Sequence, residues 1–230
     1  MAGELGNSPE MLDAHFGYVA DHHPCVLPGE PLQPGLNVCL SFDGGHFDFY
    51  HTVFPLLKKH HLRALLAVPA GLILGHSTLP PGSRLLPPDL RADPQKISGG
   101  LCTWRELREM ADSDRVAFAA HGMTLADLDG ADTNRLAEIR DSGVLLAVKL
   151  QVAVESFVFP RGRYSSAALQ TARDHYRQVF GIGQTLNSGW EEPVLHRVRG
   201  DNMDCPAAFL TPAKLRHYRA RAWWNRLCSR

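Results

Sequence analysis

Residues 37–45 read NVCLSFDGG, a run of apolar and β-favouring side chains that stops at an aspartate followed by two glycines. This pattern predicts a buried strand that delivers Asp43 into a loop. In α/β folds the catalytic side chains stand at the carboxyl ends of parallel strands, so Asp43 is a candidate catalytic carboxylate. The alternative is a plain turn, because Asp and Gly form turns in any protein.

Downstream of this strand, short apolar runs alternate with amphipathic ones. Continuous apolar runs predict buried strands, and apolar side chains at spacings of three and four predict helices. Thr103, with Glu106 three residues later, matches a capping box at a helix start. The strands are predicted at residues 62–69, 115–120, 155–159, 179–185 and 194–199, and the helices at 47–60, 103–113, 133–150, 165–176 and 211–230.

Two stretches stand outside this alternation. Residues 1–35 are predicted as a short strand, at 11–19 and containing His15, followed by a proline-rich lead-in. Residues 75–100 carry too many prolines and glycines for a helix, and they predict a rim loop over a site. A chain of 230 residues with one such alternation is expected to form a single domain.

The alternation of strands and helices predicts an α/β fold with a parallel sheet, either closed as a barrel or doubly wound. Asp43, His121 and the turn Pro160-Arg161-Gly162 each follow the end of a predicted strand. A barrel would gather all three at a single mouth, which makes them a candidate site.

Composition narrows the classes of ligand. The chain has 24 basic and 24 acidic residues, so no global field favours nucleic acid, a membrane or an acidic polymer. Its five cysteines show no C-x-x-C spacing, which argues against a zinc knuckle or a redox pair. The start has no secretion-signal pattern, and no run approaches the roughly 20 apolar residues of a membrane span. The chain as written is therefore expected to be cytoplasmic, unless its start is truncated.

The end of the chain interleaves basic residues with two tryptophans. One interpretation is a helix that faces nucleic acid or a membrane. The other interpretation, which we favour, is a terminal amphipathic helix that packs Trp223 and Trp224 on the body of the protein. The basic residues are Lys214, Arg216, Arg219, Arg221, Arg226 and Arg230.

Five ordered motifs carry a resemblance to a known family. They are SFDGG, CTWRELREM, AHGMTLADL, FVFPRGRYS and LHRVRGDN, and they extend over roughly residues 38–202. In this order and at these separations the chain resembles the polysaccharide deacetylases of the NodB-homology type, carbohydrate esterase family 4. The resemblance implies a distorted (β/α) barrel of about seven strands and a hydrolase that acts on carbon–nitrogen bonds other than peptide bonds.

The resemblance also implies roles for individual residues. Asp43 would be the general base, and His121 a ligand of a divalent metal, usually zinc, whose bound water attacks an N-acetyl carbonyl. The main-chain N–H of Arg161 would supply an oxyanion hole, for which side-chain identity matters little. The residues expected to meet the sugar are Pro160, Gly162, Arg163 and Tyr164.

The chain departs from the family pattern at two metal ligands. Gly44 stands where the family has a second aspartate, and Leu125 where it has a second histidine. A catalytic zinc site needs about three protein ligands, and glycine and leucine side chains cannot coordinate a metal. Possible substitutes by residue type are His46 and His15. An arginine that some relatives carry two residues before Pro160 is also replaced, by Val158.

Two functions follow as hypotheses. The first is a deacetylase that removes acetyl from an N-acetylated sugar or similar amide by metal-activated water. The second is a catalytically impaired relative that binds a glycan or a protein partner through the same mouth. Both expect an N-acetylated carbohydrate or related molecule as partner and neither expects nucleic acid. A metal site that holds zinc poorly fits the second better.

Overall fold

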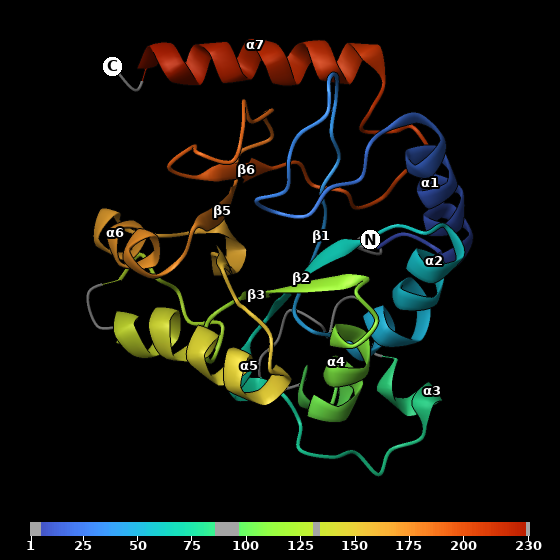
Figure 1. The fold of residues 1–230 in the computed structure, drawn as a ribbon, viewed down its shortest axis with the longest axis vertical. Coiled ribbons are helices and arrows are strands. Elements are labelled where there is room, and N and C mark those ends of the chain that lie inside the picture. Colours follow the sequence, from blue (N-terminus) through green and yellow to red (C-terminus); the bar gives the residue numbers. More distant parts are fainter. Residues whose placement is uncertain (1–5, 86–96, 131–133, 229–230) are drawn as a thin grey trace, which may run out of the picture.

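A curled parallel sheet forms the centre of the protein (Figure 1). The structure is a computed structural model that describes residues 6–85, 97–130 and 134–228. Within these residues the sheet has six strands in the order β1-β2-β3-β4-β5-β6, and every neighbouring pair is parallel. The strands are β1 (Leu40–Asp43), β2 (Ala64–Val68), β3 (Val116–Ala120), β4 (Ser156–Val158), β5 (Gln178–Ile182) and β6 (Leu195–Arg197).

Helices occupy the connections between the strands and cover the outer face of the sheet (Figure 1). Helices α4 and α5 contact β3, and α6 contacts β5. The α-helices are α1 (Pro9–His22), α2 (Phe54–Lys59), α3 (Pro81–Arg84), α4 (Trp104–Ala111), α5 (Ser142–Leu150), α6 (Ser166–His175) and α7 (Pro212–Cys228). Two π-helical turns, η1 (Phe49–Val53) and η5 (Ala137–Asp141), and three 3₁₀ turns, η2 (Ala70–Leu72), η4 (Ile97–Gly100) and η6 (Pro160–Gly162), complete the described elements.

The two faces of the sheet bury different clusters of side chains. In β2, Leu65 and Ala67 point to an inner cluster completed by side chains of β3, β4, β5 and β6. The alternate residues of β2, Ala64, Leu66 and Val68, join a larger outer cluster with the helices. Because both faces are covered, all five residues of β2 are buried, as the continuous apolar run predicted.

The sheet has one strand fewer than the seven or so that the sequence predicted. Strand pairing does not join β6 to β1 within the described residues, so the barrel stays open at that seam. Side chains cross the seam instead, where Arg197 of β6 donates to Ser41 Oγ of β1 at 3.2 Å. The prediction of a distorted α/β barrel is confirmed as a curled half-barrel.

The predicted strand at residues 11–19 is wrong, because these residues lie within helix α1. Ser8 caps the helix by accepting from the Met11 N–H at 3.2 Å, and a proline follows in the first turn. Phe16 and Val19 are buried on one face of the helix. The Ser-Pro-Glu start was a helix signal that outweighs the short apolar run.

The segment predicted as a rim loop is partly ordered. Residues 86–96 lie outside the described residues, and the four residues of α3 correct the expectation that 75–100 holds no helix. After the segment, the Cys102 N–H donates to the Gly45 carbonyl at 2.9 Å, and Leu101 forms a bridge with His46. These contacts hold the segment's end against the loop that follows β1, at the predicted end of the sheet.

The predicted helix at residues 133–150 is a π-helical turn that leads into α5, and residues 131–133 lie outside the described part of the chain. Ser142 is buried, and its hydroxyl donates to the Glu138 and Ile139 carbonyls at 2.6 and 2.9 Å. Such back-bonding competes with the regular helical ladder and accompanies the irregular turn. The capping box at Thr103 and Glu106 is present as predicted.

Candidate active site

Asp43 lies at the carboxyl end of β1 and is held by an arginine from the far edge of the sheet. Arg197 of β6 donates to both carboxylate oxygens, with Nη1 to Oδ1 at 2.6 Å and Nη2 to Oδ2 at 2.9 Å. Desolvation would raise the pKa of this carboxyl, but the Arg197 guanidinium and, less strongly, His121 lower it to about 2. Asp43 is therefore ionised throughout the neutral range.

His121 follows β3 and is only 4% exposed. Its Nδ1 lies 2.7 Å from the Val158 carbonyl oxygen, and a carbonyl can only accept, so Nδ1 carries the proton. The lone pair of the neutral ring is then on Nε2, which is the tautomer of a metal-ligating histidine. Burial lowers the pKa of His121 although the nearby Asp43 carboxylate opposes this, which favours the neutral ring.

In the loop between Asp43 and η1, a histidine side chain lies beside Gly44, the position at which the resemblance implies an aspartate. Gly44 has a φ of 99°, and a Cβ built on it would lie 2.4 Å from His46 Nε2. The imidazole of His46 therefore occupies the space into which a side chain at position 44 would project. His46 also lies close enough to Asp43 to lower the pKa of its carboxyl.

The loop from His121 to Leu125 has a constrained backbone, although the leucine at its end cannot coordinate a metal. Leu125 has a φ of 62°, a left-handed conformation that costs a β-unbranched residue about 1 kcal/mol. Glu138 of η5 holds the loop by accepting from the Met123 and Thr124 N–H groups at 2.7 and 3.1 Å and from the Thr124 hydroxyl at 2.7 Å. The leucine side chain is half-buried and offers no donor atom.

The turn after β4 brings the predicted sugar-contacting residues to the same end of the sheet. Arg161, inside the turn Pro160–Gly162, has a φ of 55°, and its Nη1 donates to Asp127 at 2.8 Å. Tyr164 stacks on Phe159 with ring centroids 4.3 Å apart. Arg163 is exposed beside them. Because the strands are parallel, this turn, Asp43 and His121 share one end of the sheet, which we call the mouth.

His15, the other substitute ligand suggested by the sequence, lies on α1 rather than at a strand end. Its Nδ1 is 2.6 Å from the carbonyl oxygen of Pro206, so the ring is engaged with the segment that precedes α7. This position is set by the helical structure of residues 9–22, which the sequence reading had missed.

The donor atoms at the mouth do not fit the metal that the family implies. Gly44 and Leu125 stand where the resemblance implies two ligands, and neither side chain can coordinate a metal. Among residues 6–85, 97–130 and 134–228, no group of three or more His, Cys, Asp and Glu side chains is arranged to hold a metal ion. A zinc site with three protein ligands therefore cannot be assembled from these side chains as they stand.

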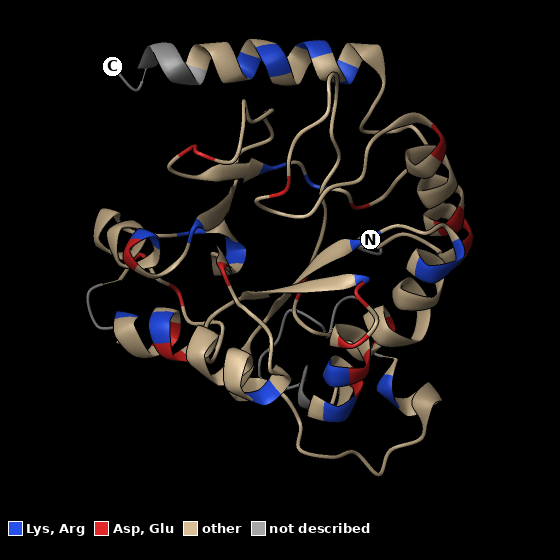
Figure 2. Ribbon diagram, viewed as in Figure 1, with Lys and Arg blue, Asp and Glu red and all other residues tan. Residues whose placement is uncertain are grey.

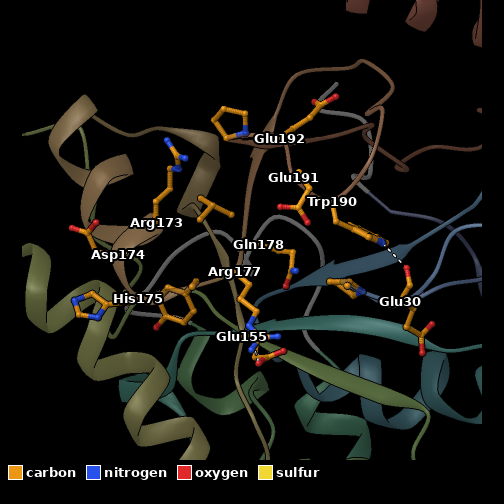
Figure 3. A pocket seen from close by; sticks show the side chains of 15 residues that line it. Glu30, Glu155, Arg173, Asp174, His175, Arg177, Gln178, Trp190, Glu191 and Glu192 are labelled. Carbon is orange, nitrogen blue, oxygen red and sulfur yellow. Dashed lines mark hydrogen bonds and ion pairs between the residues drawn. The ribbon is translucent and has the colours of Figure 1, made fainter.

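A cavity of about 780 Å³ lies at the opposite end of the sheet (Figure 3). Its lining includes Glu155, just before β4, and Gln178, the first residue of β5. Trp190 closes one side by donating its indole N–H to the Glu30 carbonyl at 2.8 Å. The cavity is distant along the strands from the carboxylate and imidazole of the mouth, so its size does not identify it as the active site.

Arg197 is a residue of the candidate site for which the sequence alone predicted no role. It belongs to the LHRVRGDN motif, and the family resemblance implies no role for the arginines of this motif. The available signal was its place in a strand, which puts a long cationic side chain on the same sheet as Asp43. The partner could not be chosen from sequence, because 153 residues lie between the two positions and pairing across the seam depends on the curl of the sheet.

Several solved structures of low sequence identity share this fold. The deacetylase PplD of Streptococcus pyogenes, solved in complex with acetate, is 22% identical with a TM-score of 0.73 over 90% of this chain and 88% of that one. IcaB from Ammonifex degensii is 20% identical with a TM-score of 0.67 over 94% and 88%. A de-N-acetylase from Aggregatibacter actinomycetemcomitans is 16% identical with a TM-score of 0.67 over 92% and 89%.

A search of curated proteins finds no match. The family model described as polysaccharide deacetylase, in contrast, matches residues 33–180, which is more than half of the chain. The matched range contains Asp43, His121 and the turn after β4, and it ends within β5. This chain belongs to the polysaccharide deacetylase family.

Proposed function

We propose that this protein binds an N-acetylated carbohydrate at the mouth and that its capacity to hydrolyse the N-acetyl group is strongly reduced. The family supports the substrate class, since its members are deacetylases of polysaccharides. The observation that carries the reduced activity is the His46 ring, which fills the space of the missing side chain at position 44. The second missing ligand, at Leu125, points the same way.

The remaining groups suit binding better than hydrolysis. A metal supplies polarisation of the carbonyl and a nucleophilic water in this class of enzyme. Here the carboxylate expected to act as base is held in an ion pair that lowers its pKa to about 2. A base with so low a pKa takes a proton poorly at neutral pH.

The turn after β4 supports retention of a binding surface. Arg161 keeps a left-handed backbone although it is not glycine, and such outliers persist where surrounding structure holds them in place. Tyr164 presents an aromatic ring and Arg163 an exposed cation next to it, both of which are suited to a sugar. The main-chain N–H of Arg161 would face the N-acetyl oxygen, because the N–H groups of Gly162 and Arg163 donate within the turn to the Phe159 and Pro160 carbonyls.

Titration calorimetry with chito-oligosaccharides and an acetate-release assay test both parts of the proposal. We expect measurable binding, and acetate release at the level of a blank with or without added zinc. Arg163→Ala should weaken binding roughly tenfold if the cation donates to the ligand. Arg105→Ala, which removes an exposed cation from α4, is the matched control and should bind like the parent protein.

Two results would contradict the proposal separately. Absence of binding to any N-acetylated oligosaccharide would refute the binding role. Stoichiometric zinc together with rapid acetate release, both lost in His46→Ala or His15→Ala, would refute the impaired mouth and locate a relocated metal site.

A further inference from the structure

Helix α7 exposes a face that the rest of the fold does not explain. The tryptophans expected to pack on the body do not do so, since Trp223 and Trp224 are each 63% exposed. The helix contacts the body through Tyr218, which is buried, and through the half-buried Leu215 and Ala222. The Tyr218 carbonyl accepts from the Thr185 hydroxyl at 3.2 Å, which fixes this inner side.

Helical geometry places the two tryptophans on the side away from the body. At about 100° per residue, Leu215, Tyr218 and Ala222 share one face, Ala220 and Trp224 fall opposite to it, and Trp223 lies to one side between the two. The exposed Arg216 lies between Trp223 and Ala220 on this outward side, and Arg219 and Arg221 lie at its borders. The outward side therefore interleaves two indoles with exposed cations.

The C-terminal segment carries a net positive charge, and the rest of the chain carries a net negative one. The segment 205–230 holds six basic residues and no Asp or Glu. Because the whole chain has 24 of each sign, the rest carries 18 basic against 24 acidic residues. Figure 2 shows Lys and Arg on α7 without an acidic residue, whereas α4 and α6 carry both signs and α1 carries acidic residues without Lys or Arg. The positive field is concentrated on α7, which lies beyond the edge strand β6 (Figure 1).

We propose that α7 is a membrane-surface anchor that docks this protein on anionic lipid. Exposed tryptophans next to arginines are suited to the interface of a bilayer, where the indole is held at the headgroup level and the cations meet anionic headgroups. The described cations and tryptophans of this outward side, from Arg216 to Trp224, extend over about 12 Å of the helix. Within the described residues, no helix is long and apolar enough to cross a membrane.

A flat anionic surface fits the outward side of α7 better than nucleic acid does. Proteins that hold single-stranded nucleic acid place aromatic side chains within a positively charged groove that follows the backbone. Here the indoles project from the convex side of a helix, where a planar surface makes more contact than a strand. Nucleic acid is kept as an alternative outcome of the experiment.

The experiment is co-sedimentation of the full chain with vesicles of phosphatidylcholine, with and without phosphatidylglycerol. We expect binding only to the anionic vesicles, falling as salt is raised, with a blue shift of tryptophan fluorescence. Trp223→Ser with Trp224→Ser, and separately Arg219→Gln with Arg221→Gln, should each reduce partitioning by about tenfold or more. Both changes replace exposed side chains, so the melting temperature should stay within about 2 °C of the parent value.

Matched controls separate α7 from general surface properties. Arg105→Gln with Arg173→Gln removes the same charge from α4 and α6, and Val144→Ser with Val148→Ser removes exposed apolar side chains from α5. Both controls should bind vesicles like the parent protein. Failure of the parent to bind anionic vesicles, equal loss in the controls, or binding to a labelled single-stranded oligonucleotide in place of vesicles would each overturn the proposal.

Discussion

At the scale of residues, two contacts define the mouth around Asp43. Arg197 donates to both carboxylate oxygens of Asp43, and the ring of His46 occupies the space beside Gly44. Taken alone, each of these contacts would be weak evidence that the mouth differs from the metal site that the resemblance implies. Together they place an ion pair and a histidine ring at the mouth, where the resemblance implies a metal.

The ion pair makes a pH prediction. The pKa of Asp43 is lowered in the folded protein, to about 2, from about 3.9 in an unfolded chain. Its contribution to stability is therefore fully present above pH ~4 and is lost as the pH falls towards ~2. Replacing Arg197 by Leu should move the midpoint of Asp43 upwards, as followed by carboxyl-carbon NMR. A midpoint unchanged in Arg197→Leu would show that Arg197 does not set it.

Restoring the ligands gives a second prediction. Gly44→Asp with Leu125→His should raise zinc occupancy well above that of either single change, because three ligands would then surround one point. The His46 ring must swing away to admit the new aspartate, since its Nε2 lies 2.4 Å from the Cβ position. Adding His46→Ala should therefore raise occupancy further, as measured by elemental analysis after dialysis. Lower occupancy in this triple variant would instead identify His46 as a ligand.

At the scale of elements, a buried ion pair joins the rim segment to α4. Arg84 of α3 and Glu106 of α4 are each 5% exposed. Two bonds of 2.7 and 2.8 Å link their side chains, and Arg84 also donates to the Leu101 carbonyl at 2.8 Å. The guanidinium lies 3.8 Å from the centre of the Phe47 ring. This cluster is what ties a segment rich in prolines and glycines to the body.

Removing one partner of this pair should cost more than removing both charges. Arg84→Met leaves Glu106 buried and ionised, and we expect a loss of about 3 kcal/mol in the free energy of unfolding. Arg84→Met with Glu106→Gln should lose less, because no charge is then left uncompensated and the amide can still serve the capping box. Urea denaturation measures both values. A double variant less stable than Arg84→Met would contradict this account.

At the scale of the whole molecule, the core is built from apolar side chains on both faces of the sheet. The outer apolar cluster takes buried side chains from β1 to β5, and the inner cluster takes them from β2 to β6. Helix caps at Ser8, Thr103 and Ser165 satisfy the starts of three helices. The fold is therefore expected to stand without the ion that the family uses in catalysis.

This expectation is measurable by thermal denaturation. A chelator should leave the melting temperature unchanged, and excess zinc should raise it by less than about 2 °C, since a ligand stabilises only in proportion to its affinity for the native state. Magnesium at the same concentration is the control for ionic strength. A large shift that zinc produces and magnesium does not would indicate a tight site and contradict the impaired mouth.

The sequence by itself determined the alternation of strands and helices and the end of the sheet at which Asp43 and His121 lie. It could do so because buried parallel strands are short apolar runs, and parallel strands all end on one side. It also predicts, through the family resemblance, that ligands are missing at Gly44 and Leu125, since this depends only on residue type. It failed at α1, where a cap and a proline outweighed a short apolar run.

Only the tertiary structure decided what the mouth contains and what α7 exposes. Arg197 reaches Asp43 because the sheet curls until its two edge strands meet through side chains, and no local pattern specifies that curl. The His46 ring enters the space at Gly44 because of a left-handed backbone. The tryptophans of α7 have the same sequence signature whether they pack on the body or face outward. Their exposure depends on which side of the helix the body contacts, and that is a property of the assembled fold.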